Sequence, residues 1–249
     1  MSTGSVHDAT SVEKIMLELH QSCRENIEQA AKSNRAEIDR VLHLEADIAT
    51  WLRILGTQPE SQQLKSAHRD FGLAFYAAMS GLYRQAFSSL RSFLEVAIGA
   101  AFLSSHELKR RQWVSGDLDI SWSSIMSIDD GLYSHHFLKE FCSEVLGEQQ
   151  PVIVSLKSVY RICSEYIHGN VSTSQLLPAD ISYDEAVCRQ WLSVAGAALI
   201  GTMHCLMVRY YKDLPPTEKA AVEASLEEHF SHSTSVRKLL GLPVEGMDS

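Results

Sequence analysis

An arginine, a glutamate and a histidine follow one another at helical spacing in the stretch 160–169: Arg161, Glu165 and His168. Positions i, i+4 and i+7 share one face of a helix, because seven residues turn the chain by about 700°, some 20° short of two turns, over a rise of about 10.5 Å. A histidine side chain changes charge near neutral pH, and a guanidinium binds phosphate oxygens bidentately. Together they could supply an acid/base group and a group that holds a phosphate.

A second pair, Arg91 and Glu95, repeats the same four-residue step on an upstream segment. In both pairs the arginine precedes the glutamate, which is the weaker orientation for an ion pair on a helix surface. We therefore expect a tertiary role, in which each arginine faces the glutamate of the other helix. The alternative is that both are ordinary ion pairs that fix the register of two packed helices, with His168 capping a carbonyl at the helix end.

The elements that position these residues are predicted to be helices. Apolar residues recur at three- and four-residue steps, and we find no convincing run of two-residue alternation. The chain has only 13 Gly and 6 Pro, which argues against an all-β protein because hairpins consume such residues. The sequence predicts an all-α bundle with further helices at both ends. Helices are expected at 83–103, 132–146, 151–168 and 182–211, the last opened by a capping box, Ser182-Tyr183-Asp184-Glu185.

The pattern divides the chain into three expected parts. Residues 1–56 form a helical arm whose apolar stripe, including Val12, Ile15 and Leu19, indicates a partner helix in this chain or in another copy. Residues 57–212 form the bundle, and residues 213–249 form a C-terminal helical appendage and tail. Gly81 is expected to permit a turn between two bundle helices.

Composition excludes several classes of protein. With 22 Lys and Arg against 31 Asp and Glu, the net charge of −9 excludes a wholly basic surface that coats nucleic acid. The five cysteines have no short regular spacing, no signal peptide is visible, and the chain lacks C-x-x-C and H-E-x-x-H motifs. We therefore expect a cytoplasmic protein without a metal or other cofactor. The nearly uncharged stretch 191–208 is interpreted as a buried core helix, not as a membrane span.

Two segments resemble the HEPN superfamily, the all-α domains named for higher eukaryotes and prokaryotes nucleotide-binding. One is the segment 83–95, which contains Arg91 and Glu95. The other is 160–169, where Arg161 and His168 are similar to the Arg-x(4–6)-His motif that this family carries near the end of a late bundle helix. With the helices between and after them, the resemblance covers about 60–211.

The resemblance implies a function. Many HEPN proteins are metal-independent endoribonucleases of toxin–antitoxin, CRISPR and phage-defence systems, and they act as dimers that juxtapose two motifs. By this resemblance His168 would be the acid/base group and Arg161 the phosphate clamp, while the RNA 2′-hydroxyl attacks its neighbouring phosphate and leaves a 2′,3′-cyclic phosphate. The partners implied are RNA or a nucleotide, a second copy of the chain, and a protein such as an antitoxin. Supporting roles would fall to Arg91, Glu95, Tyr160 and Glu165.

Two further hypotheses stand beside this one. The basic run Lys109-Arg110-Arg111, next to Trp113, could bind substrate through charge and stacking, or it could be a set of solvated charges at a helix end. The whole protein could also be a non-catalytic HEPN-like module that binds a nucleotide, RNA or a partner protein without turnover.

Overall fold

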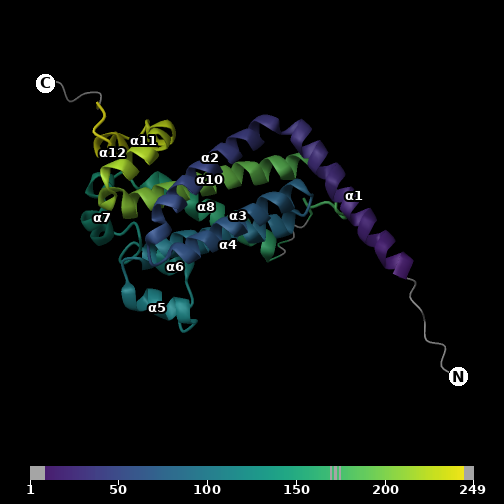
Figure 1. Cartoon of the computed structure of the whole chain (residues 1–249), viewed down its shortest axis with the longest axis horizontal. Coiled ribbons are helices and arrows are strands. Elements are labelled where there is room, and N and C mark those ends of the chain that lie inside the picture. Colours follow the sequence, from purple (N-terminus) through teal and green to yellow (C-terminus); the bar gives the residue numbers. More distant parts are fainter. Residues whose placement is uncertain (1–8, 169, 171–172, 174, 244–249) are drawn as a thin grey trace.

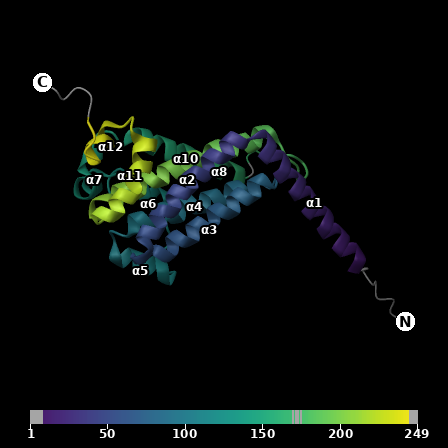
Figure 2. The ribbon, with the colours of Figure 1, turned by 45° about the horizontal axis from the view of Figure 1, so that its top comes forward.

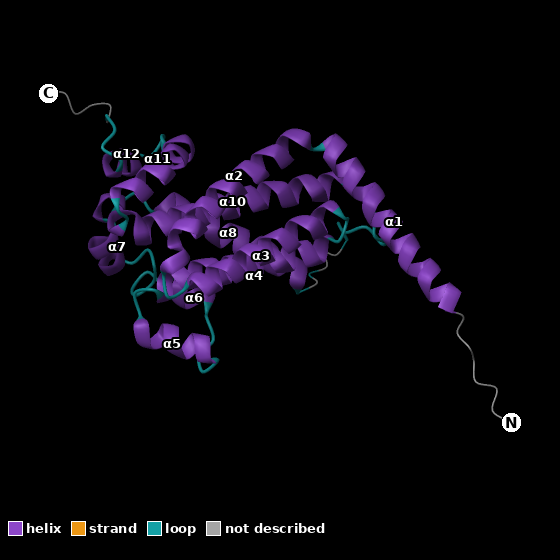
Figure 3. Cartoon of the chain, in the orientation of Figure 1, coloured by secondary structure: helices purple, strands orange, loops and turns teal. Residues whose placement is uncertain are grey.

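The computed structural model describes residues 9–168, 170, 173 and 175–243, and within these residues the chain is helical and contains no strand (Figure 1, Figure 3). The prediction of an all-α bundle with additional terminal helices is confirmed. The α-helices are α1 (Ala9–Ser33), α2 (Arg35–Ile54), α3 (Ser61–Met79), α4 (Tyr83–Leu103), α5 (Glu107–Ser115), α6 (Trp122–Ile125), α7 (His135–Phe141), α8 (Gln150–Ile167), α10 (Glu185–Tyr210), α11 (Pro216–Phe230) and α12 (Thr234–Leu239). Single 3₁₀ turns are η1 (Leu55–Thr57), η2 (Ser143–Val145) and η3 (Tyr211–Asp213).

The centre of the bundle is α10, which packs against α2, α4 and α8, while α3 and α4 share the most extensive helix–helix contact (Figure 2). Nearly the whole circumference of α10 is apolar and buried, from Val187 to Tyr210. A helix that is apolar all round is stable in water only when other helices surround it. The expected burial of the stretch 191–208 is confirmed, since Trp191 and Leu199 have no exposed surface.

The turn between α3 and α4 requires a glycine. Gly81 has φ +81°, and a Cβ built there would lie 2.8 Å from both the side-chain nitrogen Nδ2 of Asn26 and the backbone carbonyl oxygen of Ser182. The expected turn at Gly81 is thus confirmed, and the reason includes close approach as well as backbone conformation. The same turn brings α1, the start of α4 and the segment before α10 to one end of the bundle.

Two local expectations were wrong. The helix expected at 132–146 is shorter: α7 ends at Phe141, and η2 follows after Cys142. The N-cap of α10 is Asp184, whose carboxylate accepts a hydrogen bond from the Val187 amide, and not Ser182. Aspartate, like serine, satisfies an orphan amide at a helix start, so the position of the cap shifts by two residues without changing its chemistry.

The three expected parts share one hydrophobic core. Trp51 of α2 and Leu226 of α11 belong to the same cluster of buried side chains as the residues of α4, α8 and α10. Because α2 packs along α10 and α11 packs along α2, removal of either end would expose core residues.

The first helix, α1, differs from the rest because most of it projects beyond the bundle (Figure 1, Figure 2). One face of α1 carries Val12, Ile15, Leu19, Asn26 and Ala30. At its C-terminal end this face is buried, with no exposed surface at Ala30, and the Asn26 side chain is hydrogen-bonded to the backbone of Ser80 and Tyr183. The same face is exposed at Val12, Ile15 and Leu19, so its apolar stripe continues past the body that covers it.

By length and composition alone, α4 and the helical segment Glu185–Asp213 could each cross a bilayer. Of their most apolar windows, 67% and 83% respectively are buried inside the bundle. Core helices of soluble proteins have the same length and composition, so the observation places both helices in the core of this fold and says little about a membrane.

Candidate functional site

The first of the two Arg-x-x-x-Glu steps lies where α4 packs against α8. The Arg91 guanidinium donates to Glu95 Oε1 from Nε (3.2 Å) and from Nη2 (3.1 Å). Arg91 Nη2 also donates to the Tyr160 hydroxyl at 2.7 Å, and that hydroxyl donates to Glu95 Oε1 at 2.7 Å. The three side chains therefore close a ring of hydrogen bonds that joins α4 to α8.

An aromatic stack covers this ring of hydrogen bonds. Trp122 of α6 lies parallel to Tyr160, with ring centroids 4.3 Å apart and an interplanar angle of 2°. The Arg91 guanidinium carbon lies 4.7 Å from the centroid of the Tyr160 ring. Only 23% of the Arg91 side chain and 31% of the Glu95 side chain are exposed. We call Arg91, Glu95, Tyr160 and Trp122 the covered cluster.

The covered cluster is electrically balanced. Burial, together with the hydrogen bond to the Glu95 carboxylate, raises the pKa of Tyr160 to about 12, so its hydroxyl stays neutral at physiological pH. The arginine and the glutamate then cancel each other's charge, and the polar atoms that meet here have partners. Such a cluster fixes the register of two helices, and its arginine is already bonded to both other members.

The second step lies on the outer side of α8. The Arg161 side chain is 74% exposed, and its Nε lies 3.8 Å from Glu165 Oε1, which is long for a hydrogen bond. His168 is the C-cap residue of α8 and is exposed, and its backbone amide donates to the Ser164 carbonyl. Among the described residues, none is hydrogen-bonded to the His168 imidazole. We call Arg161, Glu165 and His168 the open face.

The expectation that each arginine faces the glutamate of the other helix was wrong. Arg91 pairs with Glu95 and Arg161 pairs with Glu165, each within its own helix. The residue of α8 that meets Arg91 is Tyr160, and successive helix residues diverge by about 100°. With Tyr160 turned toward α4, Arg161 must point away from it, and Glu165 lies about 140° round the helix from Tyr160.

The basic run Lys109-Arg110-Arg111 lies on α5, away from the open face. Glu107 of α5 accepts from Arg110 at 2.6 Å and from Arg111 at 2.6 Å, and these two cations hold the pKa of the Glu107 carboxyl below its ordinary value. The run follows the C-terminal end of α4, whereas the end of α8 lies beside the start of α4, where Tyr166 stacks on Phe87 with ring centroids 3.9 Å apart. The fold therefore separates Lys109, Arg110 and Arg111 from His168 by roughly the length of α4 instead of bringing them together.

Trp113, the expected stacking residue beside this run, is half-buried and packs against the core. Trp122 stacks on Tyr160 instead, a contact that the sequence pattern does not predict. No short-range signal could have found it, because Trp122 lies 38 positions before Tyr160 in an irregular segment.

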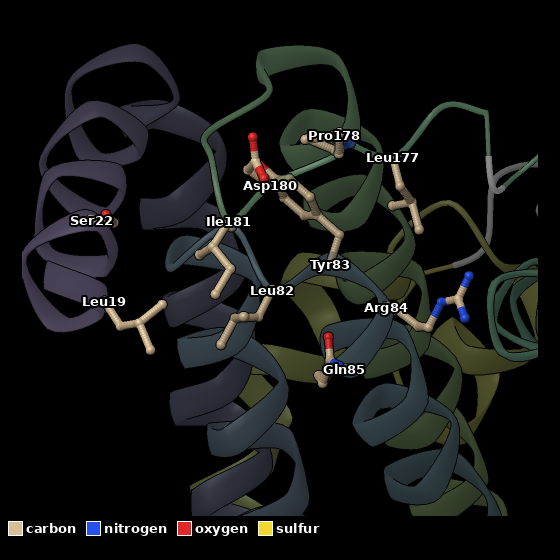
Figure 4. A pocket seen from close by; sticks show the side chains of 12 residues that line it. Leu19, Ser22, Leu82, Tyr83, Arg84, Gln85, Leu177, Pro178, Asp180 and Ile181 are labelled. Carbon is tan, nitrogen blue, oxygen red and sulfur yellow. The ribbon is translucent and has the colours of Figure 1, made fainter. Parts of the chain in front are cut away.

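A cavity of about 560 Å³ opens at the end of the bundle where α8 stops (Figure 4). Leu19 of α1, Leu82 at the turn before α4 and Ile181 in the segment before α10 give it apolar walls, and Asp180 and Arg84 give it polar ones. Neither Arg161 nor His168 lines this cavity. No sequence pattern indicates this cavity, because its walls come from three separate segments.

Comparison with protein-family models, with curated proteins and with solved structures finds no match to this chain.

Proposed function

We propose that this protein is a HEPN-like, metal-independent endoribonuclease in which His168 is the acid/base group and Arg161 binds the scissile phosphate. The observation that carries the proposal is the contrast between the two Arg-x-x-x-Glu steps. In the covered cluster Arg91, Glu95 and Tyr160 are hydrogen-bonded to one another, whereas the open face presents a solvent-exposed guanidinium with one long ion pair and an exposed imidazole on the same helix.

The chemistry needs no metal in principle. The 2′-hydroxyl of RNA loses its proton to a base and attacks the adjacent phosphorus, and the 5′-oxygen leaves with a proton from an acid, giving a 2′,3′-cyclic phosphate. His168 would transfer these protons, since imidazole exchanges them near neutral pH. Arg161 would neutralise the charge that develops on the phosphate oxygens. Its ion pair with Glu165 is loose enough for a phosphate to replace the carboxylate.

The covered cluster supports this role indirectly. Arg91, Glu95 and Tyr160 hold α8 against α4 with one side facing inward, and this keeps Arg161 and His168 on the outer side. They are positioning residues in this proposal.

A second copy of the chain would complete the site. A protomer presents one Arg161–His168 set on an open surface, which gives little exclusion of water around a reacting phosphate. The exposed apolar stripe of α1 begins at the same end of the bundle as the end of α8, because Asn26 bonds to Ser80 and Tyr183 there. Pairing of this stripe with its own copy would cover it and would bring two open faces to one end of the assembly.

The dimer is tested by light scattering on the purified chain. Replacing Ile15 with glutamate puts a charge in the exposed stripe, and we expect the mass to fall from dimer to monomer. Gln21→Glu adds the same charge on an exposed position outside the stripe and should leave the mass unchanged. A wild-type chain that is monomeric at micromolar concentration would remove the dimer from the proposal.

The activity is tested by incubating single-stranded RNA with the protein in EDTA. We expect cleavage with cyclic phosphate ends, and a fall of at least about 100-fold in His168→Ala and in Arg161→Ala. Matched controls are His135→Ala, an exposed histidine on α7, and Arg35→Ala, an exposed arginine paired with Asp39 at i+4. Cleavage that both open-face variants retain would refute the roles given to these residues.

The alternative is a non-catalytic module that binds a nucleotide, RNA or a protein partner such as an antitoxin. The cavity beside α1 favours it, since that cavity lies at the same end of the bundle and combines apolar walls with charged groups. Binding of RNA or nucleotide with no product after prolonged incubation would support the module over the ribonuclease.

A further inference from the structure

Two histidines and two carboxylates meet where the C-terminal helix α11 packs against α2. His43 and Asp47 are one turn apart on α2, and Glu228 and His229 are neighbours near the end of α11. His229 Nε2 lies 2.8 Å from Asp47 Oδ2, and His43 Nε2 lies 3.1 Å from each carboxylate oxygen of Glu228. His43 Nε2 is also 3.9 Å from Asp47 Oδ2, so the two pairs form one group.

The donor atoms are spaced as a small metal ion requires. The ligand atoms of His43, Glu228 and His229 all lie within 4.8 Å of one another. Zinc binds imidazole nitrogen and carboxylate oxygen at about 2.0–2.2 Å, which places neighbouring tetrahedral ligands about 3.3 Å apart. The separations of 2.8, 3.1 and 3.9 Å bracket that value, so small side-chain rotations suffice to bring His43, Glu228 and His229 around one ion. Asp47 lies near both histidines but outside this group of three, and it becomes the fourth donor only by turning further toward the ion.

We propose that His43, Asp47, Glu228 and His229 bind one Zn²⁺ ion, which fastens α11 to α2. The charge supports this, because two carboxylates and two neutral imidazoles carry −2 and balance the ion. Both imidazoles direct the same atom, Nε2, toward the carboxylates. On binding, any proton on either Nε2 passes to solvent and the nitrogen lone pair takes the metal.

Burial gives the site both rigidity and access. The side chains of Asp47 and His229 are only 19% and 12% exposed, so packing between the helices holds them in place. His43 and Glu228 are more than half exposed, which leaves a path for the ion from solvent. The pair formed by His68 of α3 and Glu45 of α2 offers a contrast, because in the described part of the chain it brings together one histidine and one carboxylate without a third ligand.

No local sequence pattern predicts this group of four side chains. His43 and Asp47 have the i, i+4 spacing of a metal-ligating pair, but the other two ligands follow more than 180 residues later. Only the packing of α11 on α2 brings the two halves together.

The test is titration of the full chain, freed of metal with EDTA and dialysed, with ZnCl₂ in a calorimeter. We expect one ion per chain with a dissociation constant at or below about 1 µM. At a hundredfold excess over that constant, the melting temperature should rise by at least about 5 °C. Amide hydrogen exchange in α11 should slow on addition of zinc, because the ion suppresses opening of that helix.

Variants and a cobalt spectrum show whether zinc binds at these side chains or at another place in the protein. His43→Ala and Glu228→Gln alter exposed ligands and should fold, and each should weaken zinc binding by more than about 10-fold. His68→Ala, the matched control, should leave the affinity unchanged. Co²⁺ in place of zinc should show a tetrahedral visible spectrum without a thiolate charge-transfer band, which separates this site from the five cysteines.

Three outcomes would overturn the proposal. They are the absence of stoichiometric zinc binding at micromolar concentration, binding that His43→Ala and Glu228→Gln both retain, and a thiolate band in the cobalt spectrum. The first would mean that the four side chains are only two ion pairs between α2 and α11. None of these outcomes bears on RNA cleavage in EDTA, so the two proposals fail separately.

Discussion

The covered cluster and the open face contain the same Arg-x-x-x-Glu step, and the fold uses it in two ways. Arg91 and Glu95 lie between α4, α8 and α6, where a tyrosine hydroxyl joins them and a tryptophan covers that tyrosine. Arg161 and Glu165 lie on the solvent side of α8, 3.8 Å apart. Spacing along a helix decides which residues share a face, and packing decides whether that face is covered.

The difference has an energetic meaning. A partly buried polar group costs free energy when it loses its partner, because water does not fully replace the lost bond. An exposed ion pair gains little over the hydration of its two members. The covered cluster should therefore contribute to stability, whereas the open face should be replaceable without loss of the fold.

The largest expected effect applies the same comparison to two histidines. His204 of α10 is buried beside the Tyr133 hydroxyl and the Cys205 thiol, and burial lowers its pKa to about 4, whereas His168 is exposed. In the unfolded chain His204 takes up a proton near pH 6.5, so the free energy of unfolding should fall by about 3 kcal/mol as pH decreases from 6.5 to 4. Urea unfolding of wild type and His204→Gln at pH 6.5 and at pH 4 measures the part of this fall that His204 causes.

The variant should lose less stability than wild type over this pH interval, by roughly the same 3 kcal/mol. His168→Ala is the control for the removal of an imidazole, because it replaces a histidine at an exposed position. An equal loss of stability on acidification in wild type and in His204→Gln would show that the burial of His204 does not cause this loss.

The second-largest effect is expected when the arginine of the covered cluster and the arginine of the open face are each replaced by alanine. Arg91→Ala leaves the Glu95 carboxylate and the Tyr160 hydroxyl without their cation, and we expect a loss of about 2 kcal/mol in the free energy of unfolding. Arg161→Ala should cost less than about 0.5 kcal/mol. Urea denaturation of both variants at pH 7.5 measures the difference, and similar losses would contradict the contrast between the two regions.

Much of the fold could be predicted from local pattern, and the reason is visible in particular residues. The apolar stretch around Trp191 and Leu199 predicts a buried helix because only surrounding helices can remove it from water. Gly81 predicts a turn because glycine readily adopts a positive φ, and the structure has φ +81° there. Such signals lie within a few residues of the feature they determine.

The partners of the site residues could be predicted less well. Whether Arg91 meets Glu165 or Tyr160 depends on how α8 is rotated about its axis, and a five-residue step moves the side chain by about 140°. Trp122 arrives from a short helix in an irregular segment, and the exposure of the open face depends on what packs elsewhere. The rotation of α8, the position of Trp122 and the exposure of the open face all depend on how the whole core packs, so the spacing of residues along one helix does not predict them.

A smaller effect is expected from the tyrosine of the covered cluster. Tyr160→Phe keeps the ring against Trp122 and removes the hydroxyl that bonds to Arg91 and Glu95, so the loss should be about 1 kcal/mol at pH 7.5. Because the folded-state pKa of about 12 exceeds the ordinary value of 10, the unfolded chain ionises this tyrosine first, and the contribution should fade as pH rises from 10 to 12. Unfolding of wild type and variant at pH 7.5 and 11 checks both statements.

Tyr76→Phe is the control for that experiment, since Tyr76 is exposed on α3 and the loss of its hydroxyl at pH 7.5 should cost almost nothing. A difference between wild type and Tyr160→Phe that grows between pH 7.5 and 11 would have the wrong sign and would exclude a hydroxyl kept neutral by its surroundings.

The smallest effect is expected from Glu165→Gln. The substitution removes the charge that pairs with Arg161 while it keeps the size of the side chain, and the pair is long and exposed, so the free energy of unfolding should change by less than about 0.5 kcal/mol. Glu95→Gln makes the same chemical change within the covered cluster and should cost more, because Glu95 accepts from both Arg91 and Tyr160. Urea unfolding at low and at high salt compares the two variants. A loss above about 1 kcal/mol for Glu165→Gln would mean that the open face is also a structural element, and Arg161 would then not be free to exchange its carboxylate for a phosphate.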